Sequence, residues 1–561
     1  MAVNFTPQQQ KVIDLHDRNI LVSAAAGSGK TAVLVERIIK MITEETGRVD
    51  IDRLLVVTFT KAAAAEMRER ISQAIDRRLS GEPENRHLQR QAALLHNAQI
   101  TTIDSFCLFV IRNNFNDIGL DPGFRIADEG ELTLMKQEVL EELLEQKYGE
   151  KDENFRACVE YFTGGSNDRA LEEYVDRLYE FSQSYPWPEE WLSDRMGDYA
   201  VSDAAAMEEC GWCRYLEEYI RKTLKGCAGL LDQALKTTQR PDGPYFYGEL
   251  LEKEREMAED AARAETFAAL SERCGKISFG RLPGKKDGSV SADARERAKR
   301  LRGEAKKKIE EIRESFFSVS PEQAVRRMET ALLPVNTLMS LVLQFKRMLD
   351  EKKRRENVID FHDMEHFALN ILVQRQEDGT CRATAAAREY RQFFHEILID
   401  EYQDSNLVQE LLLQSISGEE EGNYNRFMVG DVKQSIYKFR LARPELFIEK
   451  YNSYSRQDSP KQRIDLRQNF RSRQEVIESV NALFYRIMGG ELGGVEYDED
   501  AALYPGAVYP QYGQNQTETL LIERDKESRL SARQQEAAVI AARIRELIRT
   551  FQVTDRETGA L

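Results

Sequence analysis

The sequence predicts an α/β fold in which a parallel sheet with a phosphate-binding loop is interrupted by a large helical insertion. A buried strand enters the glycine loop 24–31 (AAAGSGKT), and a helix leaves it. A second strand, ILID at 397–400, ends at two carboxylates. Such elements usually lie within about one or two hundred residues of each other, but about 370 residues separate these two. A long insertion must therefore leave the sheet and return to it.

Size and composition predict a soluble protein of several domains. A chain of 561 residues exceeds what one hydrophobic core supports. Hydrophobic residues make up 41% and charged residues 31%, as in helix-rich globular proteins. No apolar run reaches about 18 residues, and the N-terminus lacks a basic segment followed by an apolar one, so we expect neither a membrane span nor a secretory signal. Seven scattered cysteines indicate reduced thiols and a cytoplasmic location.

The charge balance limits the ways in which the protein can bind nucleic acid. The net charge is −17, from 79 basic and 96 acidic residues, which argues against a protein that coats nucleic acid uniformly. It does not exclude a nucleic-acid channel, because affinity depends on local tracks of lysine and arginine.

The first 125 residues alternate short apolar runs with amphipathic helices, as parallel α/β units do. We expect strands at 19–22, 54–58 and 100–104, with helices at 31–41, at 62–79 and from residue 105. These residues form the first part of the sheet domain.

From about 126 to 375 the chain is rich in Leu, Glu, Lys and Arg at helical spacing, which predicts an all-helical insertion. Within it, eight basic residues crowd the segment 294–308. This run is either a solvated helix face that mixes both signs of charge or a contact surface for a phosphate backbone.

Strand character returns at 397–400, 427–430 and 463–466, each followed by a helix. Residues 376–455 therefore complete the sheet domain. After about 485 the chain becomes rich in loops, and the last helix is expected at 533–551.

The glycine loop has the chemistry of a nucleotide phosphate site. Gly27 and Gly29 allow backbone conformations in which successive N–H groups point at phosphate oxygens. Lys30 supplies a cation to the β and γ phosphates, and Thr31 places a hydroxyl on Mg²⁺. Ala24 stands where the usual motif has its first glycine. The predicted nucleotide-binding residues of the loop are Ala24, Ala25, Ala26, Gly27, Ser28, Gly29, Lys30 and Thr31.

Asp400 and Glu401 close the strand ILID, at the carboxyl edge of the predicted parallel sheet, where such folds bind ligands. Asp400 would hold Mg²⁺, and Glu401 would orient and deprotonate the attacking water. The alternative is an acidic helix N-cap, which favours the same position.

Several further segments resemble motifs of UvrD-like superfamily 1 helicases, in the order of that family. They are 5–9 (FTPQQ), 58–67 (TFTKAAAAEM), 101–106 (TTIDSF), 429–440 (VGDVKQSIYKFR) and 466–472 (LRQNFRS). The residue sequences of these motifs and the long insertion are most similar to those of AddA-type helicase–nuclease subunits. The resemblance implies a RecA-like domain, a helical insertion and, from about 456 to 561, the start of a second RecA-like domain.

For the nucleotide, the resemblance implies ATP with Mg²⁺. Gln9 would present its amide to the adenine edge, and Phe470 would stack on adenine where the family usually has tyrosine. Gln434 would sit near the γ-phosphate and report its loss. Arg471 would neutralise charge on the transferred phosphoryl group.

For DNA, the resemblance implies a path for a single strand along three segments. Stacking on aromatic side chains tolerates any base sequence, as a stepping motor requires. Taken singly, each aromatic residue is expected in the core rather than on a stacking platform. The implied DNA-binding residues are Thr58, Phe59, Thr60, Lys61, Ser105, Phe106, Tyr437, Phe439 and Arg440.

The segment 362–366 (HDMEH) also satisfies an HxxEH pattern known from zinc proteases. No further ligand is evident, and the preceding residues 359–361 resemble the segment that leads back into the ATPase core of UvrD-like proteins. A zinc site is therefore not expected.

The resemblance implies an ATP-dependent 3′-to-5′ helicase that acts on single-stranded and duplex-end DNA in double-strand-break repair, with an AddB-type partner. Motifs V and VI and the nuclease of such proteins are not found, so the chain is expected to be an N-terminal portion. The alternatives are a repair helicase of the UvrD or PcrA type, and a fragment that binds ATP and DNA but hydrolyses poorly.

Overall fold

The computed structural model describes residues 4–44, 48–164, 167–285, 287–490, 494–509, 516–524, 530–552 and 558. The chain divides into two compact units. Unit 1 comprises Met1–Asp128, Ser184–Pro186 and Lys353–Leu561, and unit 2 comprises Glu129–Gln183 and Trp187–Lys352. The predicted outer limits of the domains, residues 1 and 561, lie outside the described residues.

Unit 1 is built on a parallel sheet. Within the described residues, six strands form it in the order β10-β1-β9-β8-β2-β3, and every pairing between them is parallel. The strands are β1 (Asn19–Ala24), β2 (Leu54–Thr58), β3 (Gln99–Thr102), β8 (Glu396–Ile399), β9 (Arg426–Gly430) and β10 (Lys461–Leu466). The predicted α/β class with a parallel sheet is therefore confirmed.

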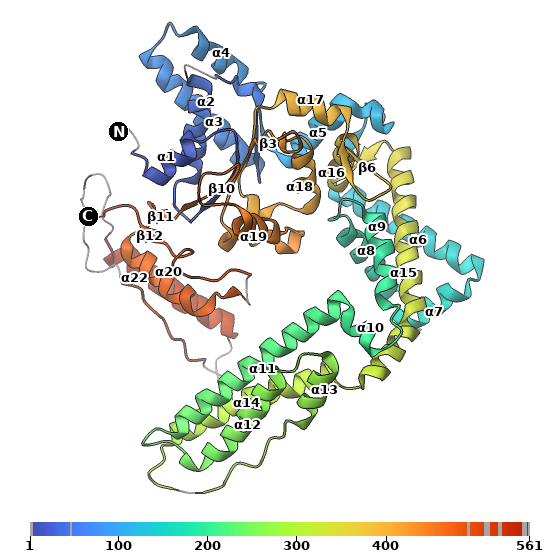
Figure 1. Cartoon of the computed structure of the whole chain (residues 1–561), viewed down its shortest axis with the longest axis vertical. Coiled ribbons are helices and arrows are strands. Elements are labelled where there is room, and N and C mark those ends of the chain that lie inside the picture. Colours follow the sequence, from blue (N-terminus) through green and yellow to red (C-terminus); the bar gives the residue numbers. More distant parts are fainter. Residues whose placement is uncertain are drawn as a thin grey trace. The chain divides into compact units, whose positions relative to one another are not determined.

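Helices cover both faces of this sheet (Figure 1). Those beside the early strands are α1 (Pro7–Asp14), α2 (Lys30–Thr43), α3 (Lys61–Gly81) and α4 (Arg86–Leu94); the others are α5 (Ile103–Asn114), α16 (Phe361–Leu372), α17 (Ala385–Phe393), α18 (Leu407–Ser415) and α19 (Pro444–Ser453). Side chains alternate between the faces of a strand. Ile20 and Val22 of β1 join the core formed with α1, α2 and α3, while Leu21 between them is equally buried on the other face. Burial on both faces explains the near-continuous apolar runs of these strands.

Two strands differ from the sequence prediction. β3 ends at Thr102 rather than at Asp104, because the Thr102 side chain accepts the N–H of Ser105 and caps α5. The helix therefore begins at Ile103, before the predicted residue 105. β10 pairs with β1, from Asn19 opposite Lys461 to Ala24 opposite Leu466. The predicted boundary between the first and second RecA-like domains, at residue 456, therefore separates β10 from the sheet to which it belongs.

All regular secondary structure in the described part of unit 2 is helical. Unit 2 holds α6 (Glu129–Glu150), α7 (Glu153–Thr163), α8 (Arg169–Ser182), α9 (Pro188–Met196), α10 (Ala204–Glu209), α11 (Gly211–Thr238), α12 (Gly248–Ala262), α13 (Phe267–Lys276), α14 (Ala292–Phe316) and most of α15 (Pro321–Arg355). Leu224 of α11, Leu251 of α12 and Ile309 of α14 share one buried cluster. This unit ends at Lys352, short of the predicted 375. The reason is α16, which has the same helical periodicity but packs against α5 and α18 in unit 1.

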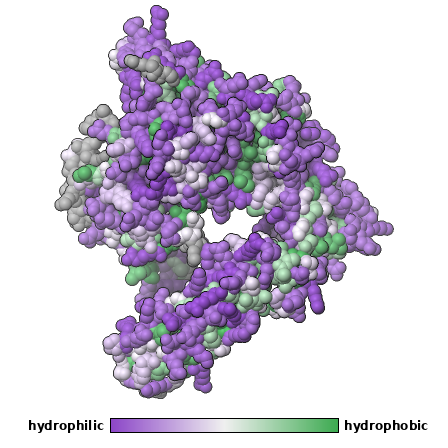
Figure 2. All heavy atoms as spheres, in the orientation of Figure 1, coloured by the Kyte–Doolittle hydropathy of each residue, from purple (hydrophilic) through white to green (hydrophobic). Residues whose placement is uncertain are grey.

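Unit 1 also contains three short strand pairs and two further helices among its described residues. The strand pairs are β4 (Arg125–Ile126) with β5 (Val358–Ile359), β6 (Val373–Arg375) with β7 (Cys381–Ala383), and β11 (Gln468–Asn469) with β12 (Tyr504–Pro505). In the sequence, helix α20 (Gln474–Ile487) lies between β11 and β12, and helix α22 (Ala532–Thr550) follows β12. Hydrophilic residues dominate the face drawn in Figure 2. In the described part of the chain, no helix has the length and apolar character needed to cross a lipid bilayer.

Candidate nucleotide and nucleic-acid site

The glycine loop connects the end of β1 to the start of α2. Gly27 and Gly29 have φ angles of 70° and 82°, in the left-handed region that favours glycine. A Cβ on Gly27 would lie 2.9 Å from the Cβ of Arg471, and one on Gly29 would lie 3.2 Å from the Gln9 amide nitrogen. Both positions therefore favour glycine through their backbone conformation, and at Gly27 the close approach of Asn469 and Arg471 is a second reason.

The loop lysine meets the acidic pair across the sequence. The Lys30 ammonium donates to both carboxylate oxygens of Glu401 at 3.0 Å, although the two residues are 371 positions apart. The Glu401 side chain is 34% exposed and that of Lys30 14%, so solvent reaches the carboxylate while the ammonium is largely covered. Thr31 follows Lys30 in the first turn of α2. The fold thus places the glycine loop and the carboxyl end of β8 at one edge of the sheet.

The acidic pair has unusual local properties. Burial, together with the Glu401 carboxylate beside it, raises the pKa of Asp400 to about 6, and Lys30 acts in the opposite direction. Glu401 has a positive φ of 51°. It precedes the 3-10 helix Tyr402–Asp404 without capping it through its side chain, while Asn406 caps α18. The side chain of Glu401 therefore does not act as a helix cap, which was the alternative interpretation of this position.

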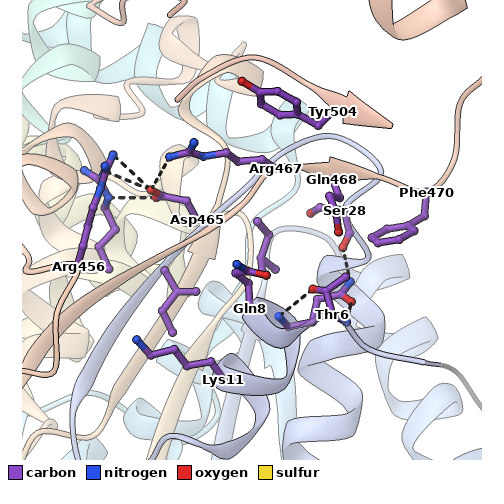
Figure 3. Close-up of a pocket in the computed structure, with 14 residues that line it drawn as sticks. Thr6, Gln8, Lys11, Ser28, Arg456, Asp465, Arg467, Gln468, Phe470 and Tyr504 are labelled. Atoms are coloured by element: carbon purple, nitrogen blue, oxygen red, sulfur yellow. Dashed lines mark hydrogen bonds and ion pairs between the residues drawn. The ribbon is translucent and has the colours of Figure 1, made fainter. Parts of the chain in front are cut away.

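A cavity of about 700 Å³ opens beside the glycine loop, within unit 1 (Figure 3). Gln9, Ser28 and Phe470 line it together with β10. The Gln9 amide donates to the carbonyl of Ser28 at 2.9 Å and accepts the N–H of Thr6 at 2.8 Å. Gln9 is thus tied to the phosphate loop as well as to the cavity, and the predicted adenine residues Gln9 and Phe470 lie in the same cavity.

Asn469 fastens the segment after β10 to the loop. Its amide donates to the carbonyl of Ala26 at 2.8 Å, and its side-chain oxygen accepts the N–H groups of Arg471 and Ser472 at 2.8 Å each. The N–H of Phe470 donates to the carbonyl of Gly27 at 2.9 Å. These bonds bring Phe470 and Arg471 to the glycine loop. Sequence reasoning missed Asn469, because its role depends on which strand pairs with β1.

Some of the predicted DNA residues form an aromatic group. The rings of Phe59 and Tyr437 stack at 4.7 Å between centroids, with an interplanar angle of 29°. The Arg440 guanidinium lies 5.5 Å from the Tyr437 ring and 5.7 Å from the ring of Phe439, which is 75% exposed. We call Phe59, Tyr437, Phe439 and Arg440 the ring group.

The residues around the ring group have local structural roles. Thr60 caps α3 by accepting the N–H of Ala63, and the buried Thr58 hydroxyl donates to the carbonyl of Thr60. Lys61, the first residue of α3, is exposed. Ser105 shares a hydrogen bond with the Thr102 hydroxyl at 2.9 Å.

Phe106 is not part of an exposed path in this structure. It is fully buried and packs with Phe109, Tyr390 and Phe394. The reason is the helix face on which it lies, since Phe106 and Val110 point from α5 into the core. The prediction that Phe106 contacts DNA is therefore corrected to a packing role.

The two remaining motifs have structural explanations. Glu365 of the HxxEH segment accepts the side-chain amides of Asn406 and Gln409 at 3.0 and 2.6 Å, and no group of three or more potential ligands (His, Cys, Asp, Glu) that could hold a metal occurs among the described residues. In the basic segment of α14, Arg302 forms two hydrogen bonds to the fully buried Glu254. Lys299, Lys306 and Lys307 pair with glutamates on the same helix. These contacts favour the solvated, structural interpretation of that run.

A parallel sheet that brings a glycine loop and an acidic pair to one edge defines a P-loop α/β protein. The model of the UvrD/REP helicase N-terminal domain matches residues 5–455, so the chain belongs to this family. The resemblance expected from the sequence is confirmed.

Similar proteins are named as the A-type subunit of an ATP-dependent helicase/nuclease. The one from Lachnoclostridium phytofermentans is 45% identical over 99% of this chain and 43% of its own length. Those from Geobacillus thermodenitrificans and Clostridium beijerinckii are 44% and 40% identical, over 99% of this chain and 46% and 47% of their own lengths. The chain thus spans less than half the length of these relatives.

Proposed function

We propose that this chain forms the ATP-binding motor region of an AddA-type DNA helicase–nuclease subunit. The observation that carries the proposal is the contact between Lys30 and Glu401, which joins the glycine loop to a candidate water-activating carboxylate. The names of the relatives support the assignment to this type of protein. An AddB-type partner, action on DNA ends and 3′-to-5′ movement belong to the same proposal.

ATP fits the residues of the loop. The left-handed Gly27 and Gly29 allow the N–H groups of the loop to converge on phosphate oxygens. The hydroxyl oxygen of Ser28 is buried and lacks a hydrogen-bond partner among the described residues, so it is available to an incoming phosphate. The cavity lined by Gln9 and Phe470 takes the base.

In hydrolysis, Glu401 orients the attacking water and accepts its proton. A γ-phosphate competes with Glu401 for Lys30, so that nucleotide binding releases the carboxylate to act as a base. Arg471, next to Gly27, stabilises charge on the transferred group. Thr31 and Asp400 would hold Mg²⁺, which supplies charge neutralisation for the phosphates.

The ring group provides the DNA contact in this proposal. Its aromatic faces stack on bases of any sequence, and Arg440 holds the backbone. Unit 2 is the helical insertion of the motor, and the residues after β10 begin the second RecA-like domain. Movement follows from closing and opening of two such domains around ATP.

The test is steady-state ATP hydrolysis by the complete protein with its partner, with and without single-stranded DNA and with Mg²⁺ or EDTA. We expect hydrolysis that requires Mg²⁺ and rises with DNA. Hydrolysis that DNA does not change would contradict the motor assignment. Absence of both nucleotide binding and hydrolysis would contradict the whole proposal.

A further inference from the structure

One buried amide joins the acidic pair to the segment that carries the ring group. Gln403 lies in the 3-10 helix Tyr402–Asp404 and is 1% exposed. Its amide nitrogen donates to the Glu401 carboxylate at 2.9 Å and to the Asp404 carboxylate at 3.2 Å. Its amide oxygen accepts the backbone N–H of Asp431 at 2.9 Å. Gln403 therefore contacts the end of β8 and the end of β9 at once.

The partners of Gln403 fix the orientation of its amide. Two carboxylates require donors, and a backbone N–H requires an acceptor. The reverse orientation would set the amide oxygen against Glu401 and Asp404 and its NH₂ group against the N–H of Asp431. A glutamate would add a third carboxylate, and an apolar side chain would leave the Asp431 N–H without this partner. The position thus selects an amide.

The neighbouring strand is shaped for the same contact. Gly430 is the last residue of β9. A Cβ on Gly430 would lie 2.2 Å from the Gln403 amide oxygen and 3.2 Å from the backbone nitrogen of Tyr402. Since atoms cannot approach so closely, any side chain at 430 would push the amide away from the N–H of Asp431. Gly430 and Gln403 are matched to each other.

The hydrogen bonds continue toward the ring group. Asp431 is 1% exposed, and its carboxylate accepts the Gln434 side-chain amide at 2.9 Å and the Lys433 ammonium at 2.8 Å. Gln434 stands three residues before Tyr437, whose ring stacks on Phe59. Hydrogen bonds therefore run from Glu401 through Gln403 and Asp431 to Gln434, and the backbone continues from Gln434 over three residues to Tyr437 of the ring group.

We propose that Gln403 is a positioning residue that couples the DNA-facing ring group to Glu401. DNA that enters between or against the rings displaces the segment 431–437, and the Asp431 N–H carries that displacement to the Gln403 amide. The amide in turn sets the direction in which the Glu401 carboxylate faces its water. This inference rests on the proposed function and adds the regulation of the same site.

The test is Gln403→Met in the complete protein with its partner. Methionine keeps the length of the side chain and removes its hydrogen bonds. We expect the ratio of kcat with single-stranded DNA to kcat without it to fall at least about tenfold, while the KM for ATP stays within about threefold. Loss of packing alone would not change this ratio, because it would affect both rates equally. A ratio within about twofold of the wild-type value, in a folded variant, overturns the proposal.

Gln91→Met is the matched control. Gln91 is also fully buried in unit 1, where its amide accepts the N–H of Ile51 at 2.8 Å and donates to Asp50 at 2.7 Å. The Gln91→Met variant should lower thermal stability as Gln403→Met does. It should leave the ratio of kcat with single-stranded DNA to kcat without it unchanged.

Gln403→Glu provides a second variant of the same size, which sets like charges against Glu401 and Asp404. It should lose stimulation as well, and its stimulation ratio decides the question if the methionine variant does not fold. A wild-type protein without DNA-stimulated hydrolysis would overturn both this inference and the proposed function. Stimulation that persists in a Gln403 variant overturns the inference alone.

Discussion

Glu401 holds a left-handed backbone conformation that costs a non-glycine residue of order 1 kcal/mol or more. The cost is tolerated because the turn directs the carboxylate toward Lys30, where two hydrogen bonds of 3.0 Å hold it. Strain of this kind concentrates at functional sites, where the surrounding structure fixes the geometry. Both the strained backbone and the contact with Lys30 thus support the assignment of Glu401 as the candidate base.

Lys30→Ala should reduce ATP hydrolysis at least about a hundredfold, because the loop loses the cation that meets the β and γ phosphates. DNA binding without nucleotide should stay within a few-fold, since Lys30 is not part of the ring group. Steady-state hydrolysis and fluorescence anisotropy of labelled single-stranded DNA measure the two effects. DNA-stimulated turnover that survives in this variant would refute the assignment of the glycine loop.

Glu401→Gln should bind ATP with near wild-type affinity and lower kcat by about 10² to 10⁴, because the amide cannot accept the proton of the attacking water. Nucleotide affinity by calorimetry and single-turnover hydrolysis separate binding from chemistry. Glu420→Gln, an exposed glutamate far along the sequence from the loop, is the control. Normal single-turnover rates in Glu401→Gln would place the base elsewhere.

At the scale of elements, a buried charge network fastens the 3-10 helix Tyr402–Asp404 to its neighbours. Glu410 of α18 accepts the Tyr402 hydroxyl at 2.8 Å, Arg426 of β9 at 3.0 Å and Lys450 of α19 at 2.8 Å. Arg426 and Lys450 hold the pKa of Glu410 at about 2, against the effect of burial. The network keeps the segment after the acidic pair in place between a strand and two helices.

Glu410→Gln should lower the free energy of unfolding at pH 7 by about 3 to 5 kcal/mol, because it removes the carboxylate that pairs with the buried Lys450 and one of the two carboxylates that pair with Arg426, which keeps Glu419. The ionised form stabilises the fold above the unfolded pKa of 4.5, and this contribution is lost as the pH falls toward the folded pKa of about 2. The difference between wild type and variant should therefore shrink over that window. Urea unfolding at a series of pH values measures it, and a difference that does not change with pH would contradict this account.

The ring group makes a prediction about DNA affinity. Tyr437→Ala should raise the Kd for single-stranded DNA about 5- to 150-fold, because one stacked base contributes about 1 to 3 kcal/mol. Tyr424→Ala, just before β9 and at the amino edge of the sheet, should leave the Kd unchanged. Equal effects of the two substitutions would show that the Tyr437 ring does not stack on bases.

The elements that the sequence predicted well are those whose signals are local. The strand before the glycine loop and the strand ILID each combine an apolar run with a motif at its end, and both stand within a residue or two of the predicted positions. Asn469 and Gln403 escaped prediction, because their partners are fixed by strand order and not by spacing in the chain. Phe106 shows the opposite error, since a motif position does not reveal which face of its helix is buried.

At the scale of the whole molecule, the candidate site draws on segments from across unit 1 and on none from unit 2. The loop at 24–31, the acidic turn at 400–404 and the segment 466–472 lie at one edge of a sheet whose neighbouring strands come from both ends of the chain. A ligand that binds there must stabilise all three segments together. The long helical unit between them folds around its own core.

Hydrogen exchange with a non-hydrolysable ATP analogue and Mg²⁺ tests this convergence. At about 100 times the Kd, binding stabilises the folded state by about 2.7 kcal/mol, which slows exchange up to about a hundredfold for amides that open with the whole unit. We expect protection in all three segments of unit 1 and unchanged exchange in α11 of unit 2, which serves as the internal control. The Lys30→Ala variant with the same analogue should show much weaker protection. Protection confined to 24–31, with none at 400–404 or 466–472, would mean that these segments do not share one triphosphate, and the assignment of Glu401 and Arg471 to the nucleotide would fall with it.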